Sequence, residues 1–305
     1  MLWSGEPPGE PGRWWLGLGP DHAPCAGFPW VIEDRKNRLR ASVLRKRVLS
    51  ALILGPLVLG IVVAGPLWFA GLVSLAVLIA AWEYARLMER GGFRLSLLWT
   101  WGSSLVGLAI VGWPGWDGLR PALTFLLMGS ITRQMVRRDR PAPVAEWALT
   151  VGGGLYLGLL GGHLAALRAT EQGLFWLLLL LLVTWAVDSG AYFVGSAWGR
   201  HKIAPHLSPG KSWEGFWGGE VSGVGVGALL GHFLGVGLTH GLAVGVLVAT
   251  LGLLGDLAVS MMKRQAGVKD SGHLIPGHGG MLDRIDSLLF AGVVGYYYVL
   301  WVVGA

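Results

Sequence analysis

Long apolar runs recur along most of this 305-residue chain. A helix needs about 20 apolar residues to cross a bilayer, and in lipid the backbone must satisfy its own hydrogen bonds. Charged residues make up only 14% of the sequence, against about 25% in average soluble domains. The sequence therefore predicts an all-α, polytopic integral membrane protein, folded as one helical bundle rather than as two soluble domains.

About nine runs are candidate transmembrane helices. The fourth is short for a crossing, and the Gly65-Pro66 boundary leaves open whether the first two cross separately. The runs cover approximately residues 49–64, 66–82, 95–113, 121–131, 144–167, 174–194, 215–236, 241–262 and 285–303.

Residues 1–43 differ from the rest of the chain. They are rich in proline and show neither a helical period nor a long apolar run. We interpret them as a poorly ordered tail before a transmembrane domain at 44–305, and whether the tail belongs to the native protein stays open. The basic residues follow the Trp-rich part instead of preceding it, which is unlike a secretory signal. Cys25 is the only cysteine, so an intrachain disulfide and a cysteine-based zinc site are excluded.

The positive charge is unevenly distributed. A net charge of +6 would suggest nucleic acid as the partner of a soluble protein. With nine spans and the amino terminus inside, however, 22 of the 24 Lys and Arg fall on the cytoplasmic side, as the positive-inside rule requires. We therefore expect no nucleic-acid partner. We expect a multi-pass protein of the inner (cell) membrane whose two polar loops in the carboxyl-terminal half face the cytoplasm.

One polar segment, residues 260–286, lies between two strongly apolar runs. Asp256, Ser260 and Lys263 are spaced to share one helix face. The segment combines cations, carboxylates and glycines, which is what binding a metal and a polyphosphate requires. The alternative is a charged loop that only joins two membrane helices.

A second polar segment, residues 188–219, begins inside a predicted span. Asp188, Glu220 and Asp256 are ionisable residues within apolar runs, where burial in lipid makes a functional role the default expectation. The segment is not a Walker A sequence, and a basic loop that merely follows the topology remains an alternative.

Both segments carry a family resemblance. The pattern Ser-x-Met-Lys-Arg, four residues, Lys-Asp-x-Gly, then Pro-x-His-Gly-Gly-Met-x-Asp-Arg-Ile-Asp resembles the signature of the phosphatidate cytidylyltransferases, the CDP-diacylglycerol synthases. The second segment resembles the other recognisable block of this family through residues 188–192, 208–209, 211 and 213–215. It departs from the family at Ser196 and Gly210, where Arg and Lys are common, and each departure removes a cation that could contact phosphate.

The resemblance implies transfer of a cytidylyl group from CTP to phosphatidate in phospholipid biosynthesis, with a catalytic half at about 183–290. It implies Mg²⁺ held by Asp256 and Asp283. The residues that it assigns to catalysis are Asp256, Lys263, Asp283 and Asp286, and those that it assigns to substrate binding are Asp188, Ser208, Lys211, Ser260, Arg264, Lys269, His278, Gly279, Gly280 and Arg284.

Two other functions fit parts of the pattern. A CTP-dependent transferase for a different lipid phosphate would carry similar loops. A secondary transporter would also combine many spans with intramembrane carboxylates, but no paired half-repeat is evident and the ionisable residues gather at one predicted surface. The sequence leaves the oligomeric state open, with a homodimer as one option.

The cation asymmetry makes the topology testable. Single cysteines placed in the loops at 86–94, 133–140, 200–211 and 263–284 of a Cys25→Ser protein should resist a membrane-impermeant thiol reagent in intact cells. They should react once the cells are permeabilised, whereas a cysteine at Arg168 should react in both cases. Labelling of any of the four loops in intact cells would show that the span count is wrong.

Overall fold

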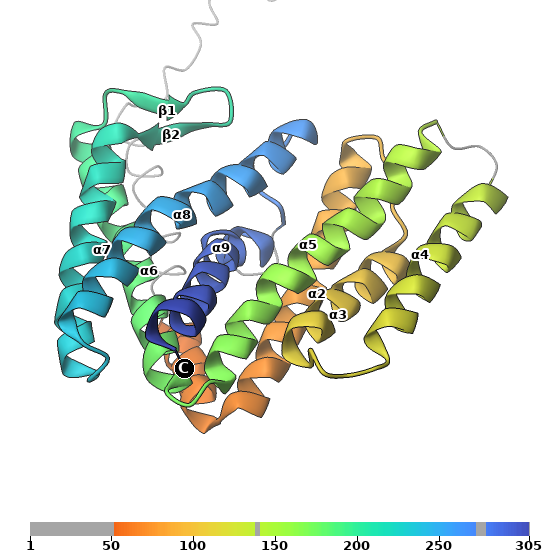
Figure 1. Cartoon of the computed structure of the whole chain (residues 1–305). Helices are drawn as coiled ribbons and strands as arrows, with labels where there is room; N and C mark the ends of the chain where they lie inside the picture. Colours follow the sequence, from red (N-terminus) through yellow and green to blue (C-terminus); the bar gives the residue numbers. More distant parts are fainter. Residues whose placement is uncertain (1–51, 138–140, 273–278, 305) are drawn as a thin grey trace, which may run out of the picture. The chain divides into compact units, whose positions relative to one another are not determined.

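The computed structural model describes residues 52–137, 141–272 and 279–304, and these are almost entirely helical (Figure 1). All of them belong to one unit of the chain, Lys46–Ala305. The tail predicted for residues 1–43 lies outside the described residues and stays a prediction.

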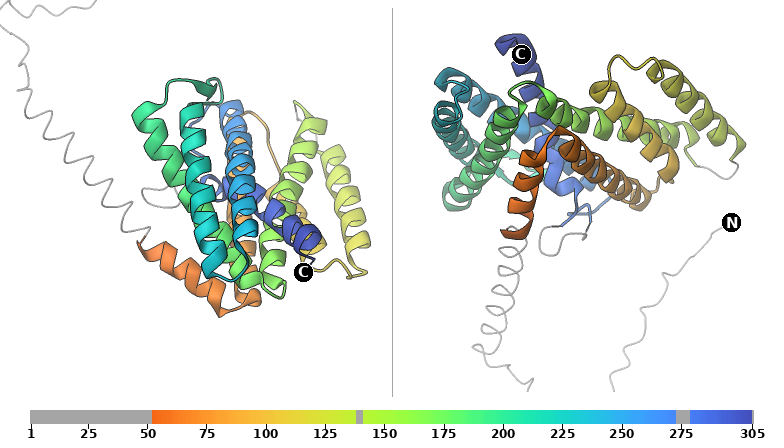
Figure 2. Two further views of the ribbon diagram at one scale, coloured as in Figure 1. Left: turned by 60° about the vertical axis from the view of Figure 1, so that its left-hand side comes forward. Right: turned by 90° about the horizontal axis from the view of Figure 1, so that it is seen from below.

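The first two helices are distinct, as the Gly65-Pro66 boundary suggested. Helix Leu52–Ala64 ends at Gly65, whose φ of 135° favours glycine, and α2 (Pro66–Arg90) begins at the following proline. Figure 2 shows the two helices meeting at a sharp angle. The sequence predicted that the second helix ends at residue 82, but α2 continues to Arg90 because its buried face extends through Tyr84 and Leu87.

The next three helices form a group with α2. They are α3 (Leu97–Gly112), α4 (Leu119–Val136) and α5 (Pro143–Ala169). Helix α5 packs closely on α3. The two backbones are so close at Gly158 that a side chain there would overlap the backbone of Ser104. The fourth predicted run, 121–131, is longer in the structure, where α4 has 18 residues.

The carboxyl-terminal half contains a small hairpin that the sequence did not predict. Helix α6 (Gly173–Trp198) is followed by the antiparallel strands β1 (Lys202–Ala204) and β2 (Ser208–Ser212), then by α7 (Trp213–Phe233) and α8 (Leu238–Gln265). Ser212 caps α7 by accepting a hydrogen bond from the Gly215 amide at 3.2 Å. Helix α6 extends past the predicted end at 194, and Asp188 lies within it, as the predicted span implied.

Helix α9 (Leu282–Tyr298) connects the two halves of the bundle. It packs against α8 on one side and α5 on the other, and it continues as the π-helix η1 (Val299–Val303). Figure 1 shows α9 between the α6–α8 group and the α2–α5 group. Leu282 and Leu289 are fully buried on its inner faces, so the core fixes the orientation of the carboxylates near its amino terminus.

Within the described residues, five helices are long and apolar enough to cross a membrane: α2, α5, α6, α8 and the continuous segment Leu282–Val303. The protein is thus an all-α membrane bundle, as predicted. Helices Leu52–Ala64 and α3 are apolar but shorter, and the count of nine spans stays a prediction.

Close packing of α7 on α8 provides a test of this arrangement. A Cβ at Gly227 would overlap the carbonyl oxygen of Gly241, whereas one at Gly225 would have nothing within 4 Å. We expect Gly227→Leu to lower the free energy of unfolding by about 1–3 kcal/mol or more through overpacking. Gly225→Leu, on the same helix, should leave it nearly unchanged. Equal thermal stability of the two variants in detergent would contradict the α7–α8 contact.

Candidate active site

The carboxyl-terminal part of α8 supplies one side of the site. Asp256, Ser260 and Lys263 follow one another along one face of this helix, as their spacing predicted. Ser260 is buried, and its hydroxyl donates to Asp256 Oδ1 at 3.3 Å. The face therefore presents a carboxylate and an ammonium group toward α9.

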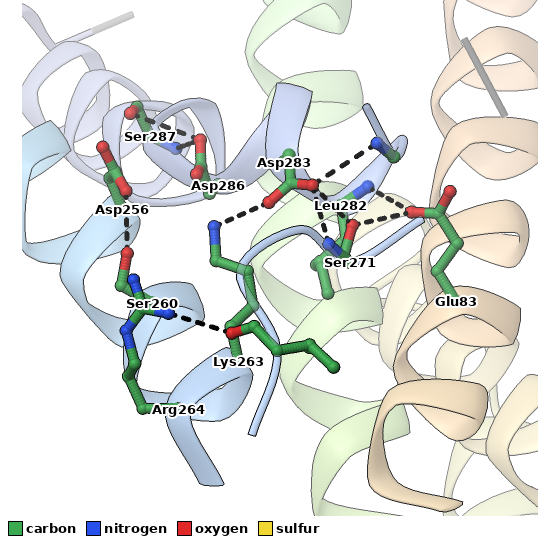
Figure 3. Close-up of polar contacts among 12 residues, drawn as sticks. Glu83, Asp256, Ser260, Lys263, Arg264, Ser271, Leu282, Asp283, Asp286 and Ser287 are labelled. Carbon is green, nitrogen blue, oxygen red and sulfur yellow. Dashed lines mark hydrogen bonds and ion pairs between the residues drawn. The ribbon is translucent and has the colours of Figure 1, made fainter. Parts of the chain in front are cut away.

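Asp283, in the first turn of α9, makes more hydrogen bonds than any other predicted site residue that the structure describes. Lys263 Nζ donates to its Oδ1 at 2.7 Å, and the side chains of this pair are only 11% and 9% exposed. Its Oδ2 accepts from the amide and the hydroxyl of Ser271, both at 2.9 Å, and from the Gly280 amide at 3.4 Å (Figure 3). Asp283 thus connects α8, α9 and the loop between them, which comprises residues 266–281. Its assignment as a metal ligand stays a prediction.

Asp286 lies one turn further along α9 and has a different environment. It is 8% exposed, and its Oδ1 accepts from the Ser287 amide at 2.8 Å. Figure 3 shows it beside Asp256, whose charge acts on its carboxyl group, as do the charges of Lys263 and Lys211. Two carboxylates from adjacent helices therefore lie close together with cations around them.

The hairpin brings the second polar segment to the same place. Lys211, in β2, forms an ion pair with Asp256 Oδ2 at 2.5 Å. Asp188, in α6, lies within electrostatic range of Asp256, Lys211 and Arg284. Residues as far apart in the chain as Asp188 and Arg284 thus converge, although Ser196 and Gly210 supply no cation here.

A cavity of about 430 Å³ opens beside these residues, between α6, the hairpin, α7 and α8. Asp188, Lys211 and Asp256 form its charged part. Val187, Val248, Leu253 and Phe216 are among the residues that make most of the remaining lining apolar. A cavity with a charged part and an apolar part suits an amphiphilic ligand.

Other predicted residues lie around this centre with different roles or exposures. Arg264 donates through Nε to the Leu207 carbonyl at 2.8 Å and through Nη1 to the Val268 carbonyl at 3.0 Å, so it holds the hairpin against the end of α8. Lys269 and Arg284 are exposed, and Ser208 begins β2 outside the cavity lining. The phosphate-binding roles assigned to these residues stay predictions.

The Gly-rich part of the loop is only partly described. Gly279 has a φ of 84°, a left-handed conformation that favours glycine, and a Cβ there would lie 3.4 Å from Asp283 Oδ2. Gly280 donates its amide to the same carboxylate. His278 lies outside the described residues.

Sequence reasoning missed Glu83 of α2, which contacts the loop from the other half of the bundle. Leu282 N donates to Glu83 Oε2 at 2.8 Å, and Ser271 Oγ does so at 3.2 Å. Glu83 lies one residue beyond the predicted span end at 82. The sequence could have indicated it, because Glu83 falls on the same apolar helix face as Val77, Ala80 and Tyr84. A carboxylate buried on such a face needs a hydrogen-bonding partner.

Comparison with known proteins gives a consistent result. A sequence model described as the cytidylyltransferase family matches residues 45–302. The phosphatidate cytidylyltransferase of Pseudomonas aeruginosa is 36% identical over 251 residues, which cover 77% of this chain and 89% of that protein. The enzyme of the same name from Mycobacterium tuberculosis is 32% identical over 245 residues, covering 75% and 74%. That of Haemophilus influenzae is 44% identical over 137 residues, covering 43% of this chain and about half, 48%, of that protein.

The buried Lys263–Asp283 pair predicts a specific pattern of stability. Lys263→Met keeps the length of the side chain but leaves Asp283 without its cation. Breaking a buried pair in this way typically costs about 3–5 kcal/mol, and we expect a loss of that order in unfolding measured in detergent.

The Lys263→Met/Asp283→Asn double variant should lose less than the sum of the single losses, because it removes the unpaired charge. Lys269→Met, which removes an exposed cation from the same loop, serves as the control. Additive losses, or a control as unstable as Lys263→Met, would refute the pairing.

Proposed function

The chain belongs to the cytidylyltransferase family, and from this we propose that it transfers the cytidylyl group of CTP to phosphatidate, giving CDP-diacylglycerol and pyrophosphate. One observation carries the proposal for this chain in particular. Lys211, in one of the two polar segments that resemble the family, and Asp256, one helical turn before the other, meet at 2.5 Å on the lining of a cavity that is otherwise mostly apolar.

The shape of the cavity supports a lipid phosphate as one substrate. Phosphatidate combines an anionic head with long acyl chains, so it needs cations next to an apolar surface. Lys211 supplies a cation on a lining that also carries the carboxylates of Asp188 and Asp256, so a bound metal would have to add positive charge there. Val248 and Leu253 of α8 supply apolar surface. The nucleotide, which carries no apolar chain, would approach from the polar loops.

The chemistry requires cations more than it requires a base. A phosphate oxygen of phosphatidate attacks the α-phosphorus of CTP and forms the new P–O–P bond. The bond from that phosphorus to the oxygen bridging to the β-phosphate breaks, and pyrophosphate leaves with the electron pair. A phosphate monoester carries about −1.5 to −2 charges near neutral pH, so its oxygen is already nucleophilic. Lys211 and Lys263 would reduce the repulsion between the reactants and stabilise the charge on the leaving group.

We also propose Mg²⁺ as the cofactor. Mg²⁺ commonly takes one or two protein carboxylates and completes its coordination with phosphate oxygens and water. Asp256 and Asp286, side by side on α8 and α9, fit that requirement. Among the described residues, no three His, Cys, Asp or Glu side chains group together to hold a metal. When bound, Mg²⁺ would offset phosphate charge.

The ligands expected from the resemblance were Asp256 and Asp283. The donors already bound to Asp283 favour Asp286 as the partner of Asp256, with Asp283 holding Lys263 in position.

We propose that the site faces the cytoplasm from the inner membrane. The distribution of Lys and Arg in the sequence supports this orientation, and CTP is available on that side. No contact described above requires a second copy of the chain.

The proposal is tested with the purified protein in mixed micelles. We expect pyrophosphate release from CTP only when phosphatidate and Mg²⁺ are both present. Asp256→Asn should lower the rate by about 10²–10³-fold, because an electrostatic contact to the transition state is lost. Asp117→Asn, which alters an exposed carboxylate far along the sequence from both polar segments, should retain full activity. Release that does not depend on phosphatidate would refute the assignment of the substrate.

A further inference from the structure

Glu83 is a buried carboxylate to which the proposed chemistry gives no role. It lies on α2 and is only 1% exposed, among apolar neighbours on the same face that include Ala80 and Leu87. Burying a carboxylate is costly unless hydrogen bonds compensate for the lost hydration. Its contacts therefore indicate why it is there.

Those contacts are with the start of α9 and the loop before it. Glu83 Oε2 accepts from the amide of Leu282, the first residue of α9, at 2.8 Å, and from the hydroxyl of Ser271 at 3.2 Å (Figure 3). Met281, at the N-cap position of α9, makes no side-chain capping bond. An anion near the amino end of a helix is stabilised by the unpaired amides and the helix dipole. Glu83 supplies that anion from a helix about 200 residues earlier in the chain.

Ser271 extends the contact into the site. Its hydroxyl lies 3.2 Å from Glu83 and 2.9 Å from Asp283 Oδ2, and its amide also donates to Asp283 at 2.9 Å. Asp283 in turn accepts from Lys263. A continuous series of polar contacts therefore runs from α2 through the loop and α9 to α8.

Two glycines allow the loop to approach Glu83 this closely. A Cβ at Gly272 would lie 2.6 Å from Glu83 Oε1, and one at Gly280 would lie 2.5 Å from Oε2. Any side chain at either position would push the loop away from the carboxylate. Helix α2 therefore packs closely against the loop at two places: at Gly272, next to Ser271, and at Gly280. Ser271 and Gly280 both donate hydrogen bonds to Asp283.

We propose that Glu83 is a positioning residue for the reaction. It fixes Ser271 and the first turn of α9, and through them it sets the position of Asp283 and Lys263. This inference rests on the proposed function. Glu83 does not line the cavity, so it acts through the residues that it holds and does not touch the substrates.

The test compares variants that keep or remove the acceptor. Glu83→Ala removes both hydrogen bonds, and displacing catalytic groups by about 1 Å can cost roughly 10²-fold in rate. We expect a loss of that size in kcat with little change in the KM for CTP. Glu83→Gln keeps an oxygen able to accept both bonds. Because those bonds are retained, its kcat should stay within about tenfold of the wild-type value. Ser271→Ala removes the hydroxyl that contacts both Glu83 and Asp283 but keeps the Ser271 amide bond to Asp283 and the Leu282 amide bond to Glu83, so its loss should be intermediate.

Glu89→Gln is the matched control, because it removes an exposed carboxylate from the same helix. It should behave as wild type. A Glu83→Ala protein with wild-type kcat would overturn the inference, and so would a Glu83→Gln protein as impaired as Glu83→Ala.

Hydrogen–deuterium exchange on the same samples gives a readout that needs no turnover. Glu83→Ala should speed exchange in peptides containing Ser271 and Leu282 while leaving the α3–α5 peptides unchanged. Unchanged exchange at Ser271 and Leu282 would overturn the anchoring role. An inactive wild-type protein would instead refute the proposed function, and the exchange data would still decide whether Glu83 anchors the loop.

Discussion

The carboxylate of Asp283 accepts hydrogen bonds from groups that belong to three different segments. Lys263 comes from α8, Ser271 from the loop, and Gly280 from the residues just before α9. In a site of low polarity, removing any of these donors would leave a buried charge poorly compensated. The positions of Ser271 and Gly280 relative to α8 and α9 therefore depend on this carboxylate, and the other contacts of the site are arranged around it.

The membrane explains why such a site is built at helix ends. Within lipid, only helices satisfy their own backbone groups, so irregular chain with exposed amides is confined to the surface or to protein-lined cavities. The loop, the hairpin and the first turn of α9 are where backbone donors are available. Asp188 and Asp256, by contrast, lie within helices and extend the polar region toward the apolar part of the cavity. Membrane lipid and water-soluble nucleotide can thus meet at one place.

The two halves of the bundle contribute unequally to this site. The α6–α9 half supplies the side chains that we assign to the substrates and the metal. The α2–α5 half contributes Glu83, which supports the loop from behind, and it packs on α9 through α5 and α2. Catalytic groups are more accurately placed when a second set of contacts holds them, so a helix without a direct role can still affect the rate.

The sequence by itself determined the class of the fold, the approximate helix positions and the polar segments that matter. Apolar runs long enough to span a bilayer leave the backbone few alternatives to helix, and the i, i+4, i+7 spacing of Asp256, Ser260 and Lys263 follows from helical geometry alone. Only the tertiary structure decided which carboxylate meets which cation. The pairing of Lys211 with Asp256, the donors around Asp283 and the contact of Glu83 with Leu282 each join segments far apart in the chain. The spacing of residues along a helix predicts the face on which a side chain lies. The partner of that side chain depends on how the helices pack against one another, and the whole core determines this packing.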